Sequence, residues 1–380
     1  MVRVALDAAG GDHGLEATVA GAATLSCEDN DIHVILVGDN RGIADALERL
    51  RYDPARLTVC HADGAVTMAD EPRAALDRLP RCSIAVAAEL VRDGAADALV
   101  SAGNTGATIL AAATTFERLP GIRRAALAAV YPTEQRHGPR RDPFALMLDV
   151  GATLTATADD LAAFAVMGAA YSAIVSEIGS PRVALLSNGT EASKGTPEIV
   201  EAHARLRASA LNFVGNVEGL DIPRGSVDVI VCGGFLGNVV LKMLEGVSDV
   251  FVDIARQAAG RKLQWRVGLA MLGGGLRELH RLTDWKGYGG APLLGLDRVV
   301  IKAHGRSEAR AIRNALKVAA KTARGDLIGR IRAGTASLTP PSADRTGPPG
   351  AGGRAVDGVQ GGARCRRIVR PPGRRRPATA

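Results

Sequence analysis

The stretch ADALVSAGNTGATILAAATTF, residues 96–116, passes from a short apolar run through a loop of small polar residues into a helix-like segment. The loop contains Asn104, Thr105 and two glycines, Gly103 and Gly106, but no His, Cys, Asp, Glu or Lys. Unpaired backbone N–H groups and the helix dipole favour an anion at a helix N-terminus. Asn and Thr are also ordinary capping residues. The stretch therefore predicts a strand–loop–helix unit whose loop either binds an anion or only caps the helix.

The same order of strand, loop and helix recurs along the chain. Apolar runs of about five residues end in Gly/Asn/Ser loops, and a helix-like segment follows each loop. This alternation predicts a mostly parallel sheet with helices on both faces, a fold that binds ligands at the carboxyl ends of its strands. The strands expected from these runs are residues 2–7, 32–38, 96–100, 144–150, 183–187, 227–232 and 298–302.

Composition places the chain among reduced proteins of the cytoplasm. It has 380 residues, 47% of them hydrophobic and 3% aromatic, enough for one large domain or two lobes. Its five cysteines form no CxxC pair and no zinc-type spacing, so no structural metal is expected. The N-terminus lacks the order of a signal peptide, and no run approaches the roughly 20 apolar residues of a transmembrane helix.

The basic charge belongs to the C-terminal tail. The net charge is +7, yet residues 331–380 contain ten Arg and two Asp, which leaves residues 1–330 with a net charge of −1. The tail is rich in Pro, Gly and Arg, a composition typical of disorder. It either is merely solvated or contacts an anionic surface, and no nucleic-acid partner is expected because no aromatic residues interleave with the arginines. We expect a catalytic domain over residues 1–330 and a disordered tail over 331–380.

The loop GGDHG, residues 10–14, follows the first expected strand and adds ionisable groups to the small-residue pattern. Gly11 and Asp12 are candidates for substrate contact. His13 is a candidate for proton transfer, because an imidazole titrates near neutral pH. A loop histidine bonded only to backbone is an equally open interpretation.

Three later loops supply further polar candidates. Lys194 lies in NGTEASKG and is a candidate point charge for phosphate. Asn238 and Lys242 are four residues apart, so they share one face of a helix near its N-terminus. Lys302 and His304 end a strand on the same side of the sheet. Lys194 and Lys242 also have the simpler interpretation of solvated surface residues.

Seven motifs in this order resemble the bacterial phosphate acyltransferases of phospholipid synthesis, the PlsX family. They cover about residues 2–322. The motifs are VALDAAGGDHG, VSAGNTGAT, LDVGAT, FAVMGAAY, NFVGNVEGLDI, CGGFLGNVVLKMLEG and YGGAPLLGLDRVVIKAHGRSEARAI.

The resemblance implies a three-layer α/β/α fold with a mostly parallel sheet, similar to isocitrate and isopropylmalate dehydrogenases and related to phosphotransacetylases. It implies a homodimer in the cytoplasm with peripheral membrane contact. The implied reaction converts acyl-[acyl-carrier-protein] (acyl-ACP) and phosphate to acyl-phosphate and free acyl carrier protein (ACP). A membrane glycerol-3-phosphate acyltransferase then uses the acyl-phosphate. The implied membrane-contacting segment is residues 261–285.

This reaction needs no protein nucleophile, cofactor or metal, because phosphate itself attacks the thioester. The site has to hold a dianion and stabilise an oxyanion. We therefore expect the loop at 103–106 to hold phosphate and Asn238 to donate to phosphate or the oxyanion. Lys194 and Lys242 are expected to supply positive charge. His13, or else His304, is expected to handle protons.

Departures from the family pattern keep two alternatives open. Gly233 stands where the family has Asp, which would suit a weakened paralogue that only binds phosphate or the acyl carrier. A phosphotransacetylase-like enzyme that uses acyl-CoA is the other alternative. A dehydrogenase is disfavoured because the chain shows no clear GxGxxG fingerprint with a downstream acid.

Overall fold

Strands and helices alternate along the chain, as the apolar runs predict. The computed structural model describes residues 1–261, 264, 271, 289–338 and 365–367. The strands are β1 (Val2–Asp7), β2 (Ile32–Gly38), β3 (Leu57–His61), β4 (Ala98–Ser101), β5 (Ala126–His137), β6 (Asp142–Leu148), β7 (Val183–Leu186), β8 (Phe213–Val217), β9 (Val229–Val231), β10 (Ala291–Leu294), β11 (Val299–Lys302) and β12 (Cys365–Arg367). The helices are α1 (Gly14–Glu28), α2 (Asn40–Leu47), α3 (Pro72–Arg78), α4 (Ser83–Arg92), α5 (Thr105–Thr115), α6 (Ala158–Val175), α7 (Pro197–Arg207), α8 (Asp221–Arg224), α9 (Gly234–Arg261), α12 (Ala309–Arg324) and α13 (Leu327–Ala336).

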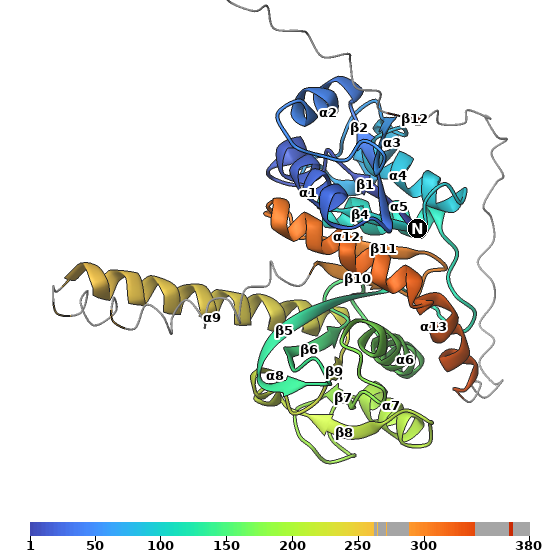
Figure 1. Cartoon of the computed structure of the whole chain (residues 1–380). Coiled ribbons are helices and arrows are strands. Elements are labelled where there is room, and N and C mark those ends of the chain that lie inside the picture. The colour runs from blue at the N-terminus through green and yellow to red at the C-terminus, as the bar shows by residue number, and fades with distance from the viewer. Residues whose placement is uncertain (262–263, 265–270, 272–288, 339–364, 368–380) are drawn as a thin grey trace, which may run out of the picture.

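One sheet runs through the described chain in the order β12-β3-β2-β1-β4-β11-β10-β5-β6-β9-β7-β8. From β3 to β11 the neighbours are parallel, and so are those from β6 to β8. Antiparallel pairing of β10 with β11 and β5, and of β5 with β6, joins these two blocks. Figure 1 shows the blocks as two lobes, with β5 leading from one to the other. The mostly parallel α/β sheet expected from the sequence is confirmed.

Side-chain alternation along the strands explains the layers. On β1, Val4 and Leu6 belong to a core beneath α1 and α12, whereas Ala5 points to the core beneath α4 and α5. In the second lobe, Leu146 and Leu148 of β6 pack beneath α6 and α7. Because strands buried on both faces need apolar side chains on both, they read as continuous apolar runs in the sequence.

Helix α6 is the described helix that is long and apolar enough to cross a membrane. Its 18 residues have a mean hydropathy of 1.4, which corrects the expectation that no such run exists. In this structure 78% of that window is buried inside the protein. The helix begins with a capping box in which Thr157 and Asp160 bond each other's backbone N–H groups. Its apolar surface serves as the core of the second lobe.

The folded body continues past residue 330. Helix α13 runs to Ala336, and Ile331 is fully buried against the second lobe, so the limit expected at residue 330 is too early. Within the remaining tail, Cys365–Arg367 pair antiparallel with β3. Most of the segment 261–285, for which membrane contact is implied, lies outside the described residues.

Candidate active site

A cavity of about 610 Å³ opens where loops from both lobes meet. Its walls come from the segments that follow β1, β3, β4, β6 and β11, from β5 and β10, and from the first turns of α9. Among the residues predicted for the site, those that line it are Asp12, Thr105, Asn238, Lys242, Lys302 and His304. The carboxyl ends of the strands therefore converge on one cavity, as expected for this fold class.

Three buried polar side chains form a row beneath this cavity. Asp7 of β1 is in register with Ser101 of β4, and Ser101 is in register with Lys302 of β11. Side chains in register on adjacent strands point to the same face of a sheet. Asp7, Ser101 and Lys302 are 3%, 0% and 5% exposed, and the Ser101 hydroxyl donates to Asp7 Oδ2 over 2.7 Å. The row places a carboxylate and an ammonium on either side of one serine.

Burial changes the ionisation of both ends of the row. Loss of hydration lowers the pKa of Lys302 to about 8, although Asp7 and Asp12 pull it in the opposite direction. Burial raises the pKa of Asp7, and the hydrogen bond from Ser101 and the charge on Lys302 offset part of that rise. Lys302 donates to the Ala303 carbonyl oxygen. With a pKa of about 8, Lys302 is mostly protonated at neutral pH. An anion bound beside it would stabilise the protonated form further.

The N-terminus of α5 contributes to the same cavity, but through fewer groups than expected. Asn104 caps the helix by accepting from the Ala107 N–H over 3.1 Å, and its amide donates to carbonyl oxygens of Thr67, Met68 and Asp70. The capping interpretation therefore accounts for Asn104, which also anchors the loop that carries Met68 to the cavity wall. Thr105, at the first helical position, does line the cavity.

The glycines of this region serve close packing. A Cβ on Gly10 would lie 2.6 Å from the backbone nitrogen of Gly103, so the loops after β1 and β4 touch through their backbones. The Gly103 N–H donates to Ser101 Oγ over 3.0 Å. Gly11 and Gly106 are outside the cavity lining, and Gly106 packs against Pro72. Gly103 is thus a structural partner of the buried row, and its N–H is already used within the protein.

His304 and Arg306 occupy the cavity rim beyond β11. The Arg306 N–H donates to His304 Nδ1 over 3.2 Å, so a neutral ring carries its proton on Nε2. Burial, and then the charges of Lys242, Lys302 and Arg306, lower the pKa of His304, while Glu245 raises it. His304 is therefore neutral at physiological pH. Lys242 forms an ion pair with Glu245 over 2.7 Å on the opposite wall.

Asp149 organises the wall contributed by the second lobe. Its carboxylate accepts from the N–H groups of Leu127, Gly151, Ala152 and Thr153 at 2.8–3.1 Å. Helix α9 packs directly on this turn, where a Cβ on Gly237 would lie 1.9 Å from the Asp149 carbonyl oxygen. This contact places Asn238 beside Gly151 at the cavity wall.

Two of the predicted ionisable residues are not brought to the cavity. His13 is exposed at the N-cap of α1, where its side chain caps no N–H group. Lys194 is exposed in the loop after β7, next to Glu191, and does not line the cavity. Their roles in catalysis remain predictions that the geometry does not support.

Cys232 is a buried thiol and a poor nucleophile. It is 3% exposed, its Sγ donates to the Asp149 carbonyl oxygen over 3.4 Å, and burial strongly raises its pKa. Across the described residues, no cluster of His, Cys, Asp and Glu is arranged to hold a metal ion.

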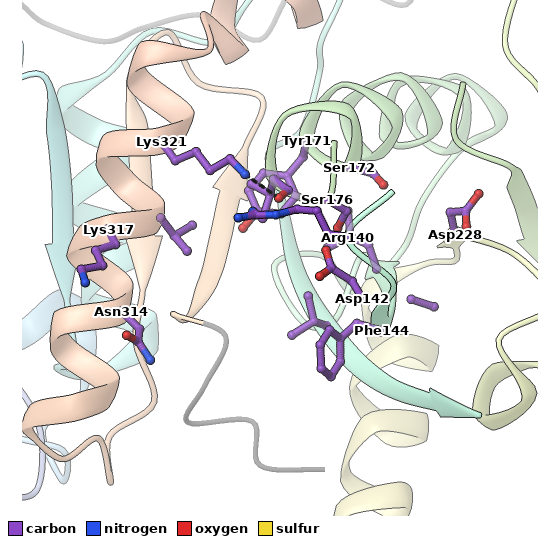
Figure 2. Close-up of a pocket in the computed structure, with 15 residues that line it drawn as sticks. Arg140, Asp142, Phe144, Tyr171, Ser172, Ser176, Asp228, Asn314, Lys317 and Lys321 are labelled. Carbon is purple, nitrogen blue, oxygen red and sulfur yellow. Dashed lines mark hydrogen bonds between the residues drawn. The ribbon is translucent and has the colours of Figure 1, made fainter. Parts of the chain in front are cut away.

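A second cavity of about 400 Å³ lies between α6, α12 and the β5–β6 hairpin (Figure 2). Its basic side chains are already paired, Lys317 with Glu28, and Lys321 and Arg140 with Glu177. Asp228, on the other side of this cavity, binds His137 and Arg182. We take the larger cavity as the candidate active site, because it combines a buried lysine, a helix N-terminus and apolar residues in its wall.

Comparison with known proteins identifies the family to which the chain belongs. A family described as "Fatty acid synthesis protein" matches residues 2–330. The phosphate acyltransferase of Myxococcus xanthus is 46% identical over 332 residues, which cover 87% of this chain and 92% of that protein. The phosphate acyltransferase of Moorella thermoacetica is 42% identical over 335 residues, covering 86% and 96%. The chain belongs to the phosphate acyltransferase family.

Solved structures agree with this phosphate acyltransferase at the level of fold. A phosphotransacetylase from Streptococcus pyogenes aligns with a TM-score of 0.56 and 19% identity, over 85% of this chain and 94% of its own. The EutD phosphotransacetylase of Staphylococcus aureus aligns with a TM-score of 0.54 and 18% identity, over the same shares. The predicted similarity to the fold of phosphotransacetylases is confirmed.

Sequence reasoning missed two residues of the buried row. Asp7 ends the first strand and Ser101 ends the fourth, and each reads as an ordinary strand terminus. One feature of the sequence could have indicated them. Asp7, Ser101 and Lys302 each stand at the end of an apolar run, and these runs were expected to form parallel strands. Polar residues at such equivalent positions meet when their strands are neighbours, and the strand order could not be read from the sequence.

Proposed function

We propose that this phosphate acyltransferase moves a fatty acyl group from the thioester of acyl-ACP to inorganic phosphate. A phosphate oxygen attacks the thioester carbonyl carbon, the C–S bond breaks, and the ACP thiol and an acyl-phosphate leave. The acyl-phosphate then supplies a membrane acyltransferase that acylates glycerol 3-phosphate. The observation that carries the proposal is the buried Lys302, which lines a cavity that has both polar and apolar residues in its walls.

In this proposal Lys302 and the N-terminus of α5 hold phosphate. The ammonium and the first-turn N–H groups at Thr105 supply positive potential from two sides. A buried cation interacts more strongly with an anion than a surface lysine does, because water screens it less. Asp7 keeps Lys302 charged in spite of its burial.

Groups on the opposite wall act on the thioester. Asn238 makes no side-chain hydrogen bond to another described residue, so its amide is available to donate to the oxyanion that forms on the carbonyl oxygen. Neutral His304, with its proton on Nε2, donates a hydrogen bond to the departing sulfur, and the thiolate takes up the proton that the attacking hydrogen phosphate loses. The paired Lys242 adds to the positive potential at the cavity mouth.

We further propose that the protein acts as a homodimer in the cytoplasm, with peripheral contact to the membrane. Helix α9 projects from the lobe junction, away from the rest of the molecule (Figure 1). Its exposed apolar residues recur at three- or four-residue spacing and form one stripe. The stripe comprises Phe235, Val239, Met243, Val247, Val250 and Ile254. A second copy of the helix would bury it, and flotation with anionic phospholipid vesicles tests the membrane contact.

The reaction is tested with purified protein, palmitoyl-ACP and inorganic phosphate, by following the release of ACP thiol and the formation of acyl-phosphate. We expect thiol release that depends on phosphate and that falls at least tenfold in Lys302→Met and Asn238→Ala. A parallel reaction with palmitoyl-CoA measures donor choice. Faster release of CoA than of ACP would favour a phosphotransacetylase-like enzyme.

A catalytically weakened paralogue is the second candidate, and Gly233 is the observation that favours it. The residue precedes α9, and a Cβ there would meet only Ala156, at 3.7 Å, so Asp fits. Absence of turnover in the wild type, with phosphate or ACP still bound, would support this candidate. Restored turnover in Gly233→Asp would then identify the cause.

A further inference from the structure

The segment between β3 and α3, residues 62–71, crosses the edge of the sheet at which the active-site cavity lies. We call it the strap. It leaves the sheet after β3, yet the methyl group of Met68 reaches the backbone of Gly305 after β11, where an added Cβ would lie 2.8 Å from Met68 Cε. In the order β3-β2-β1-β4-β11 these two strands are four intervals apart, roughly 19 Å. The strap therefore extends past the carboxyl ends of the three strands between them.

The strap is held in a defined shape. The side-chain amide of Asn104, at the N-terminus of α5, donates to three of its carbonyl oxygens at 3.1–3.4 Å. These oxygens belong to Thr67, Met68 and Asp70. Within the strap, the Asp70 carboxylate accepts from the Thr67 N–H over 2.8 Å, and Val66 is buried in the core beneath α4 and α5. The residue that caps α5 thus also fixes the strap beside the cavity.

Met68 is the side chain that the strap contributes to the cavity lining. It is 43% exposed, so one side of it meets solvent while the other side faces the cavity. Lys302 and Thr105, where we propose that phosphate binds, line the same cavity. An unbranched thioether side chain adapts to irregular space and holds water only weakly. Met68 is therefore suited to keep water away from a phosphate bound at this wall.

Water is the nucleophile that competes with phosphate in this reaction. If a water oxygen attacks the thioester carbonyl carbon, the C–S bond breaks and a free fatty acid leaves with the ACP thiol. Attack of water on the acyl-phosphate gives the same fatty acid and returns phosphate. Closing a site to water prevents such losses of a reactive product. The cover over the phosphate therefore affects which product forms.

We propose that the strap determines the choice of phosphate over water, with Met68 as the cover over the bound phosphate and Asn104 as the positioning residue that holds the strap. The inference rests on the proposed function, because it takes phosphate and acyl-ACP as the substrates. It goes beyond that function by assigning product specificity to a segment that lies outside the buried row of Asp7, Ser101 and Lys302.

The test measures the ratio of palmitate to palmitoyl-phosphate formed from palmitoyl-ACP and phosphate, by mass spectrometry and after subtraction of hydrolysis without enzyme. In Met68→Ala this ratio should rise on the order of tenfold, because the variant loses the contact of a large apolar side chain. Met68→Leu keeps a similar apolar volume and should keep the wild-type ratio. Val214→Ala on β8, where Val214 is 47% exposed outside the cavity lining, is the matched control and should not change the ratio.

Asn104→Ser separates the strap from the helix cap. Serine is a good N-cap residue, so α5 keeps its first turn, but its shorter side chain does not reach the three carbonyl oxygens of the strap. We expect the same rise in palmitate as in Met68→Ala, with unchanged circular dichroism. An unchanged ratio in Met68→Ala, or an equal rise in Met68→Leu, would show that the strap does not exclude water.

Hydrogen exchange of residues 62–71, with and without inorganic phosphate, requires no turnover and separates this inference from the proposed function. We expect phosphate to slow exchange in the strap of the wild type, and to slow it less in Asn104→Ser. If the wild type forms no palmitoyl-phosphate but phosphate still slows this exchange, the strap covers the anion and the proposed reaction is wrong. If phosphate leaves the exchange of the strap unchanged, the strap does not cover phosphate, whatever the turnover.

Discussion

Asp7 and Lys302 flank Ser101 in a single row of side chains that crosses β1, β4 and β11. Neighbouring strands are about 4.8 Å apart, so the Cα atoms of the two charged residues are separated by roughly 10 Å. Each is nearly buried, and each changes the ionisation of the other. Burial lowers the pKa of Lys302, and Asp7, two strands away, acts against that effect.

Phosphate use should decline above about pH 8. The pKa of Lys302 is lowered to about 8, so the cation is present below that pH and is lost as the pH rises through it. The kcat/KM for phosphate reports the free enzyme, and we expect an alkaline limb with an apparent pKa near 8. Lys302→Met should lack this limb and have a kcat/KM lowered about tenfold to a hundredfold, the value of a charge-assisted hydrogen bond. An unchanged limb in that variant would assign it to another group.

Asp7→Asn should move the same limb to lower pH. Removing the carboxylate takes away the attraction that holds the Lys302 pKa up, while burial continues to lower it. We expect a shift of about one pH unit, with the phosphate KM more affected at pH 8 than at pH 6.5. Asp93→Asn, which breaks the exposed pair with Arg92, is the control and should leave the profile in place. Equal loss of activity at all pH values would mean that Asp7 acts only in folding.

The sequence predicted those strands that are apolar throughout. The runs ending at Asp7, Gly38, Ser101 and Lys302 were located to within a few residues. The expected strands did not include β3, β5, β8 or β10. The outer half of β5, PTEQRH, is polar because most of it is exposed or half-buried and it pairs only with β6. Strand β10, APLL, contains Pro292 and lies between glycines, a pattern typical of a turn. A continuous run of apolar residues identifies a strand only where both faces of that strand are buried.

Residues that line the cavity were predicted where the local sequence pattern also defined the direction of their side chains. Lys302 and His304 follow from alternation at a strand end, and Asn238 and Lys242 from helical spacing, and all four reach the cavity. Lys194 was proposed from residue type in a loop, and its loop follows a strand far along the sheet from β4. Loop residues without a defined direction could not be placed before the strand order was known.

Gly237→Ala should be strongly destabilising, although alanine is the better helix former. The added Cβ would lie 1.9 Å from the Asp149 carbonyl oxygen and 2.9 Å from Cys232 Sγ, so α9 would have to move. We expect a loss of about 2–3 kcal/mol in the free energy of unfolding by urea, and reduced turnover because Asn238 moves with the helix. Gly246→Ala on the same helix meets nothing within 4 Å and should gain about 0.5–1 kcal/mol. Similar effects of the two substitutions would show that α9 does not pack on Asp149 in solution.

Asp228→Asn should weaken the second lobe without touching the active site. Asp228 is 5% exposed and accepts from His137 Nδ1 at 2.5 Å and from Arg182. Burial opposes its charge, but these hydrogen bonds outweigh it and hold the pKa of Asp228 well below its usual range. Its contribution to stability is therefore present above about pH 4 and is lost as the pH falls further. We expect a loss of about 3 kcal/mol at pH 7 by urea unfolding, shrinking in acid, with turnover of the folded fraction unchanged. A difference that stays constant down to pH 2 would assign the effect to packing.

Charged residues on the outer stripe of α9 should separate the proposed dimer into monomers. Met243 and Val247 are 60% and 48% exposed, one helical turn apart on the side away from Leu241. Met243→Glu with Val247→Glu would bury two like charges between paired helices, which an interface does not tolerate. We expect light scattering to give the mass of two chains for the wild type and of one chain for the double variant, with unchanged circular dichroism. Glu201→Gln with Glu198→Gln, on the exposed face of α7, changes charge elsewhere and should leave the mass unaltered. A wild type of single-chain mass would remove the stripe as a dimer contact and leave it available to the membrane.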